Sequence, residues 1–164
     1  MEDESSPYYF KANPNYPDGT DLNNPIKIYT DGVFDCFHYG HARLFEKIKK
    51  MFPHVHLIVG VCKDEDIILE KGPPIFDLSQ RIESVKHCRW VDAVEIAPWI
   101  PTCDFLDKIN AHYIAHDPEP YPYKDQKDVY SSLKEVNRFI QPGKERLVKA
   151  SVLQPVNSGL KFLV

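Results

Sequence analysis

Apolar and polar positions along the middle of the chain follow two different periods. Short apolar runs predict strands at residues 26–30, 55–62, 91–95 and 112–115. Segments in which apolar residues recur every three or four positions predict helices at residues 39–50, 64–70, 79–87, 102–109 and 126–138. Alternating strands and helices are typical of a parallel sheet covered on both faces. We therefore expect an α/β fold, a Rossmann-like doubly wound parallel sheet in a single domain.

The first part of the chain lacks this pattern. Residues 1–25 carry several prolines and asparagines together with Asp18 and Gly19, which is turn chemistry without periodicity. We expect an N-terminal arm there, leading into a domain at residues 26–140. The whole chain of 164 residues has an apolar fraction of 43%, which is enough for one core.

Charge and cysteine content exclude several classes of function. The net charge of −4 provides no broad basic face, so we expect no nucleic-acid partner. No apolar run approaches the length of a membrane span, and the acidic N-terminus is unlike a signal peptide. We expect a cytoplasmic protein, with a nuclear or membrane-associated pool as the alternative. The four cysteines lack the spacing of a zinc site, which indicates reduced structural thiols and no metal centre: Cys36, Cys62, Cys88 and Cys103.

The connection from the first strand to the first helix carries the candidate chemistry. It reads DGVFDCFHYGH over residues 31–41. In doubly wound sheets ligands bind beyond the carboxyl ends of the strands, and the first turn of a helix has free N–H groups that attract anions. Gly40 lets a phosphate approach the backbone, and His38 and His41 could donate hydrogen bonds to its oxygens. In the alternative reading, one histidine caps the helix and the other packs in the core.

Six blocks extend this motif. HYGH resembles the H-x-G-H signature of the nucleotidyltransferase superfamily. Together the blocks resemble the catalytic domain of the CTP:phosphocholine cytidylyltransferase family from about Lys27 to Phe139: IYTDGVFDCFHYGHARL, LIVGVCKDE, KGPPIF, HCRWVDAV, APW and IAHDPEPY. The resemblance implies a Rossmann-like homodimer that acts in phosphatidylcholine synthesis. Its reaction transfers a cytidylyl group from CTP, with Mg²⁺, to phosphocholine and gives CDP-choline and pyrophosphate.

The resemblance also assigns roles to residues around the phosphates. His38 and His41 would stabilise the α-phosphate during transfer, and Lys71 would place a cation on the triphosphate or on phosphocholine. The residues that would contact the nucleotide are Gly32, Phe34, Gly40, Arg81 and Arg89. Lys71 could instead be a solvated lysine, and either arginine a surface ion pair. Gln80 departs from the family, which has glutamate there.

A trimethylated ammonium cannot donate an N–H hydrogen bond, so aromatic faces and a carboxylate bind it. The candidate choline-binding residues, which match family positions, are Asp31, Trp99, Tyr121, Tyr130, His116 and Asp117. In the alternative reading the aromatic rings pack in the core and residues 116–117 form a turn. Phosphoethanolamine is the alternative substrate, because several blocks also resemble the sister enzyme that uses it.

The C-terminal segment, residues 141–164, departs from the family. The second family signature, R-T-E-G-I-S-T, should lie near residues 144–150, where this chain reads KERLVKA. A spliced or frame-shifted end, loss of activity and rebuilt triphosphate contacts would each explain this difference. Two functions therefore stay open: an active cytidylyltransferase, and a catalytically silent domain that binds choline compounds or nucleotide.

Overall fold

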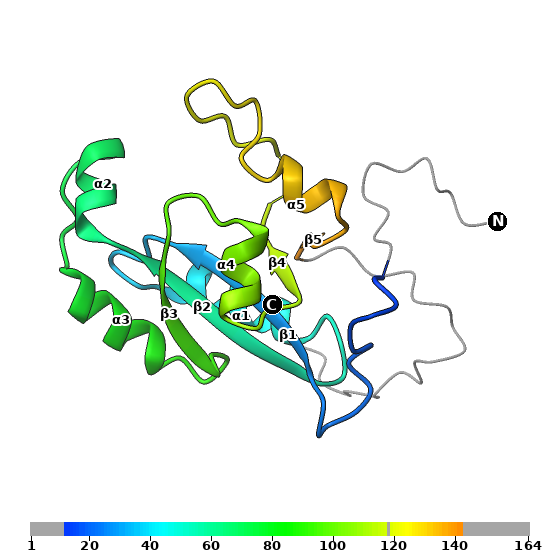
Figure 1. The fold of residues 1–164 in the computed structure, drawn as a ribbon. Helices are drawn as coiled ribbons and strands as arrows, with labels where there is room; N and C mark the ends of the chain where they lie inside the picture. The colour runs from blue at the N-terminus through cyan, green and yellow to red at the C-terminus, as the bar shows by residue number, and fades with distance from the viewer. Residues whose placement is uncertain (1–11, 118, 143–164) are drawn as a thin grey trace, which may run out of the picture.

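A computed structural model describes residues 12–117 and 119–142 and contains one five-stranded parallel sheet (Figure 1). The strands lie in the order β3-β2-β1-β4-β5, with bounds β1 Ile26–Gly32, β2 Val55–Cys62, β3 Ala93–Ala97, β4 Tyr113–Ala115 and β5 Phe139–Ile140. The helices are α1 Tyr39–Lys49, α2 Asp64–Glu70, α3 Leu78–Lys86, α4 Cys103–Lys108 and α5 Ser131–Glu135. The predicted α/β Rossmann-like class is confirmed.

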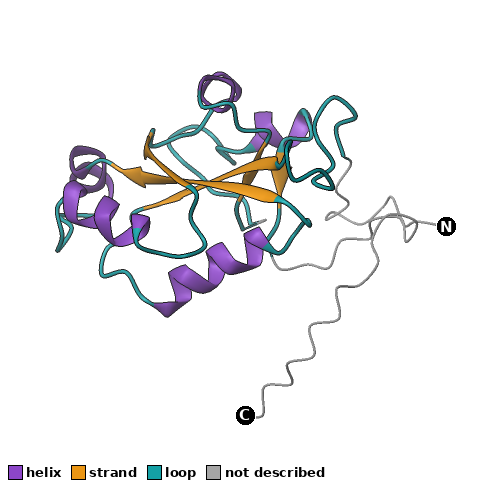
Figure 2. Cartoon of the chain, turned by 90° about the horizontal axis from the view of Figure 1, so that it is seen from below, coloured by secondary structure: helices purple, strands orange, loops and turns teal. Residues whose placement is uncertain are grey.

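Helices lie on both faces of the sheet, which Figure 2 shows from its edge. Ile28 of β1 packs in a cluster with Phe45 of α1 and Val85 of α3. The next residue, Tyr29, packs on the opposite face with Leu106 of α4. Successive side chains of a strand point to opposite faces, so a strand covered on both sides is apolar at nearly every position.

The predicted helix at residues 126–138 is wrong in extent. Only α5 is helical within that range, and β5 follows it. Asp128 accepts hydrogen bonds from the N–H groups of Tyr121 and Tyr130, which holds the preceding residues in a turn. Asn137 has a φ of 56°, a left-handed conformation that ends a helix. The other predicted elements are confirmed, with ends shifted by up to two residues.

The strand order creates a switch point beside β1. β2 lies on one side of β1 and β4 on the other, and the Thr30 hydroxyl donates a 2.9 Å hydrogen bond to the carbonyl of Ala115 in β4. The chain leaves these two strands in opposite directions, which opens a crevice at their carboxyl ends. The β1–α1 connection and His116 lie at this carboxyl edge.

The part of the arm that the structure describes packs at the opposite, amino edge. The N–H of Asn13 donates to the Tyr113 hydroxyl at 3.0 Å, and the ring of Tyr16 stacks on His112 with centroids 5.0 Å apart. Within residues 12–117 and 119–142, no helix has the length and apolar character needed to cross a bilayer.

Candidate active site

His38 and His41 form a close pair at the start of α1. Their ring centroids lie 4.0 Å apart and their planes are inclined by 30°. His38 is the N-cap residue, and no acidic side chain occupies the first turn of the helix. The positive end of the helix dipole and both imidazoles therefore meet at one place, which suits an anion.

The hydrogen bonds of the pair determine its tautomers. Nδ1 of His38 accepts from the N–H of Gly40 at 3.0 Å, and Nδ1 of His41 accepts from the N–H of His38 at 3.3 Å. A neutral imidazole that accepts at Nδ1 carries its proton on Nε2. Burial, followed by the charge of His38, lowers the pKa of His41, so this ring is neutral at pH 7. Both rings can therefore donate from Nε2.

Two neighbours hold the pair in place. A Cβ on Gly40 would lie 2.8 Å from Cε1 of His38, so only glycine leaves room for this imidazole. Phe34 is buried beneath the pair, and its ring meets that of His41 edge to face at 5.4 Å. The backbone of Phe34 has a φ of 51°, a strained conformation for an aromatic residue. A nucleotide contact of Phe34 would therefore use its backbone or its ring edge.

Asp31 lies at the end of β1 within the same edge. Burial raises the pKa of its carboxyl to about 7, although the 3.2 Å hydrogen bond from the Tyr29 hydroxyl acts in the opposite direction. Gly60 is the β2 partner of Asp31, and a Cβ there would lie 2.2 Å from that hydroxyl. The glycine therefore leaves the space in which Tyr29 reaches the carboxylate.

The predicted aromatic residues occupy this edge in different environments. Tyr130 is buried, and its ring lies tilted against that of His116 with centroids 4.8 Å apart; burial, and then the charge of Asp31, raise the pKa of Tyr130. Trp99 is half-buried against Cys62 and Ile67. Tyr121 is 39% exposed. Asp31 and Tyr121 thus lie close enough to Tyr130 for their charges to affect its pKa. Trp99 lies on the side of the edge formed by β2 and β3.

The connection that follows β4 contributes the remaining choline candidates. His116 is half-buried, and burial lowers its pKa; Asp117 is exposed. The Asp128 carboxylate accepts hydrogen bonds from Nζ of Lys134 at 2.6 Å and from the N–H of Tyr121, which fixes this connection. The Tyr123 hydroxyl donates to Glu70 at 2.6 Å, which ties the connection to the end of α2.

The predicted cations have three different environments. Lys71 is exposed at the end of α2, with Nζ 5.8 Å from the centroid of the Trp99 ring. Arg89 is exposed and stacks on Trp90 at 4.3 Å, at the amino edge of the sheet. Arg81 is 1% exposed and donates to three carbonyls and to Asp64, so its guanidinium is already bound inside the protein.

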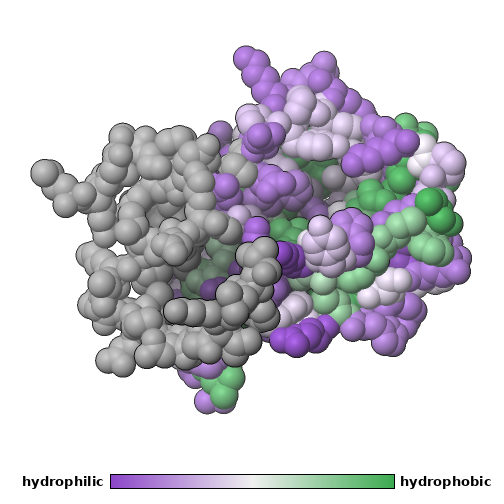
Figure 3. Space-filling view, turned by 180° about the vertical axis from the view of Figure 1, so that it is seen from behind, coloured by the Kyte–Doolittle hydropathy of each residue, from purple (hydrophilic) through white to green (hydrophobic). Residues whose placement is uncertain are grey.

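The surroundings of Lys71 are partly apolar. Figure 3 shows apolar side chains gathered on the side of the molecule where α2 and α3 lie in Figure 1. The exposed apolar residues of α2 and of the connection to α3 are Ile68, Leu69, Ile75 and Phe76. In the part of the chain that the structure describes, His, Cys, Asp and Glu form no group of three that could hold a metal ion. Its cysteines are free thiols.

Five further residues shape the site and were not predicted from the sequence: Tyr29, Asp35, Gly60, Asp64 and Asp128. Tyr29 could have been found, because it lies two residues before Asp31 on a strand and therefore points to the same face. The others act through contacts between distant segments, such as Asp35 with Ile75, which no local pattern reveals. The block predicted near residues 144–150 lies outside the described residues. The roles assigned to the predicted residues stay predictions.

Comparisons with known proteins agree with this arrangement. A cytidylyltransferase-like family model matches residues 29–155. The chain is 44% identical over 125 residues to choline-phosphate cytidylyltransferase 2 of Arabidopsis thaliana, covering 74% of this chain and 41% of the relative. It is 41% identical over 138 residues to choline-phosphate cytidylyltransferase A of Homo sapiens, covering 84% and 38% respectively. The chain thus spans about two fifths of the length of these relatives.

Two further matches are more distant. Ethanolamine-phosphate cytidylyltransferase of Dictyostelium discoideum is 36% identical over 121 residues, covering 73% of this chain and 33% of the relative. The crystal structure of the lipopolysaccharide core biosynthesis protein from Thermoplasma volcanium GSS1 has a TM-score of 0.56 at 21% identity, covers 73% of this chain and 97% of its own, and supports the fold alone. The family resemblance of the sequence is confirmed: this chain belongs to the cytidylyltransferase-like family.

Proposed function

We propose that this chain transfers a cytidylyl group from CTP to phosphocholine, giving CDP-choline and pyrophosphate. The observation that carries the proposal is the histidine pair at the start of α1. Both Nδ1 atoms accept hydrogen bonds from backbone N–H groups, so both Nε2–H groups can donate to a ligand. The identity of 41% and 44% to relatives named choline-phosphate cytidylyltransferase supports the substrate, because two relatives named ethanolamine-phosphate cytidylyltransferase are 36% and 38% identical.

The reaction is an in-line displacement at the α-phosphorus. A phosphate oxygen of phosphocholine forms the new P–O bond while the bond to the bridging oxygen of the β-phosphate breaks, and pyrophosphate leaves with that electron pair. Negative charge grows on the non-bridging oxygens of the α-phosphate. The Nε2–H groups of His38 and His41 and the positive end of the α1 dipole would stabilise that charge. Lys71 would follow the charge of the phosphates as a mobile cation.

The methylated ammonium would bind beside Asp31. Its carboxylate supplies the opposite charge, and the neighbouring ring of Tyr130 supplies an aromatic face, with Tyr121 and Trp99 as further walls. Mg²⁺ would enter with the triphosphate of CTP, whose phosphate oxygens are ligands that it prefers. We also propose a homodimer, as the family resemblance implies, which light scattering of the purified protein would test.

A pyrophosphate-release assay tests the proposal. The chain is incubated with CTP and Mg²⁺ and either phosphocholine or phosphoethanolamine, with His41→Ala as the control. We expect release that depends on His41 and is faster with phosphocholine. Equal rates with the two acceptors would contradict the preference for a methylated cation.

A catalytically silent binding domain is the second candidate. It is favoured by residues 144–150, which read KERLVKA where the family signature carries glycine and hydroxyl side chains. Loss of several phosphate contacts, each contributing about 3 kcal/mol, would stop turnover and leave choline binding intact. Titration calorimetry with phosphocholine separates the candidates: binding without pyrophosphate release supports the silent domain.

A further inference from the structure

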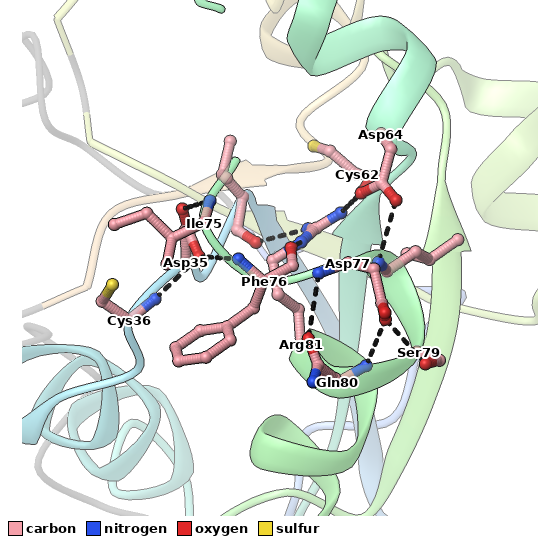
Figure 4. Close-up of polar contacts among 12 residues, drawn as sticks. Asp35, Cys36, Cys62, Asp64, Ile75, Phe76, Asp77, Ser79, Gln80 and Arg81 are labelled. Atoms are coloured by element: carbon pink, nitrogen blue, oxygen red, sulfur yellow. Dashed lines mark hydrogen bonds and ion pairs between the residues drawn. The ribbon is translucent and has the colours of Figure 1, made fainter. Parts of the chain in front are cut away.

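Arg81 joins three separate segments of the carboxyl edge (Figure 4). Its Nη1 donates to the carbonyl of Val33 at 2.7 Å and its Nε to the carbonyl of Phe76 at 3.0 Å. Its Nη2 donates to the carbonyl of Cys62 at 2.8 Å and pairs with Asp64. The side chain lies wholly inside the protein, so these contacts are not screened by water.

Each of these acceptors belongs to a segment that leads to a candidate site residue. Val33 begins the connection from β1 to the histidine pair, and Phe76 lies in the connection from α2 to α3 that starts at Lys71. Cys62 is the last residue of β2, and Asp64 is the first residue of α2. One guanidinium thus fixes the spacing between the histidine segment, residues 33–41, and the lysine segment, residues 71–77.

Asp35 provides a second tie between the same two segments. Its carboxylate accepts from the N–H groups of Ile75 at 2.7 Å and Phe76 at 3.0 Å, as Figure 4 shows. These backbone donors, Ile75 first, hold the pKa of the carboxyl below its usual range. Asp64 adds a contact to the N–H of Leu78 at 3.0 Å, at the start of α3. The two segments are therefore joined at the buried and at the exposed side.

We propose that Arg81 is a positioning residue that holds the histidine segment and the lysine segment in register, so that the imidazoles and Lys71 meet the phosphates of one nucleotide. The role rests on the proposed function and replaces direct nucleotide contact, because the buried guanidinium gives four of its five N–H donors to this network. A lysine could satisfy only part of the set, because the planar fork of arginine reaches several acceptors at once.

Hydrogen exchange measured by mass spectrometry on the unliganded chain tests the positioning role. In Arg81→Lys we expect exchange in residues 33–41 and 71–77 to accelerate by at least about tenfold, since their shared contacts are lost. Exchange in β4 and β5 should stay at the wild-type rate. Wild-type exchange in both segments of the variant would overturn the proposal.

Arg138→Lys is the matched control. Arg138 is also buried, and it donates to the carbonyls of His112 and Ala111 and to Asp107, all at the amino edge. We expect faster exchange near residues 107–113 and exchange at the wild-type rate in the histidine segment. Faster exchange of residues 33–41 in Arg138→Lys as well would overturn the claim, because a general loss of stability would then explain both variants.

Kinetics add a readout that a general structural role would not move. At a temperature where both variants are folded by circular dichroism, Arg81→Lys should lower kcat by at least about tenfold with a smaller change in the KM for CTP. Arg138→Lys should change neither. A rise in KM alone would indicate a direct contact with CTP and contradict the positioning role.

Two outcomes need a separate arm. If Arg81→Lys fails to fold, Asp35→Asn is measured in its place, because this change on the exposed side leaves the buried arginine intact. Faster exchange in residues 33–41 and 71–77 of this variant would support the claim that the two segments are joined. Exchange at the wild-type rate would overturn that claim. If the wild-type chain releases no pyrophosphate, the proposed function fails, whereas the exchange comparison still tests the positioning role.

Discussion

The two edges of the sheet use the same three side-chain types for different purposes. The amino edge has a buried Arg138, Trp90 facing two cations, and His112. The carboxyl edge has the buried Arg81, Trp99 facing Lys71, and the histidine pair. Residue type and burial are therefore similar at both edges, and the segments that each group joins are what differ.

At the amino edge these groups connect strands and helices to one another. His112 accepts from the N–H of Lys27 at 2.9 Å, and Tyr16 covers its ring. Trp90 lies near Lys50 and Arg89. At the carboxyl edge, by contrast, Nδ1 of His38 and Nδ1 of His41 accept from N–H groups at the start of their own helix, and no described residue accepts from the buried Nε1–H of Trp99. Binding capacity is thus concentrated at the carboxyl edge.

The largest effect should come from the histidines. His41→Ala removes a preorganised donor and should cut turnover by at least about a hundredfold with little loss of stability. His112→Ala should do the reverse: a partly buried hydrogen bond is lost, the free energy of unfolding falls by about 1 kcal/mol, and turnover of the folded protein is kept. Pyrophosphate release and urea unfolding measure the two quantities. Equal turnover losses in both variants would erase the difference between the edges.

The sequence predicted the positions of strands and helices better than it predicted contacts between distant segments. Strand and helix periods placed β1 and α1 correctly, and with them the histidines, because each period is a local property. The end of α5 was missed because Asn137 and Asp128 act against a helical apolar pattern. Arg81 was predicted as a nucleotide contact, and its enclosure by Val33, Cys62 and Phe76 depends on segments up to 48 positions apart. No local pattern contains that information.

The two tryptophans give the next comparison. Trp99→Ala should weaken phosphocholine binding by roughly tenfold and CTP binding much less, since a desolvated cation–π contact is worth about 1–2 kcal/mol. Trp90→Ala should leave both affinities unchanged, because its ring already faces Lys50 and Arg89. Calorimetric titration of each variant with each ligand provides the test. Equal weakening of both ligands by Trp99→Ala would mean that the indole only packs.

Choline binding should depend on pH through Asp31. Its pKa of about 7 means that the carboxylate is charged above that pH and neutral below it. Affinity for a cation should therefore rise roughly tenfold from about pH 6 to about pH 8 and be lost as the pH falls. Choline is the better probe, because the phosphate of phosphocholine titrates in the same range. A pH-dependence that survives in Asp31→Asn would assign the effect to another group.

The smallest effect concerns Tyr29. Its hydroxyl donates to Asp31 and lowers the pKa of that carboxyl against the effect of burial. Tyr29→Phe removes a hydrogen bond worth about 1 kcal/mol, so the midpoint of the choline titration should move up by less than about one pH unit. Carboxyl carbon chemical shifts measured by NMR follow this midpoint directly. A downward movement would contradict the assigned hydrogen bond.

NMR of the chain with ¹⁵N-labelled histidine rings tests most directly whether the carboxyl edge binds the nucleotide phosphates through its imidazoles. On addition of CTP we expect the Nε2 resonances of His38 and His41 to shift while both atoms stay protonated, and His112 to keep its resonances. Unchanged resonances of the pair at saturating CTP, or a shift of His112 as large as theirs, would contradict that claim.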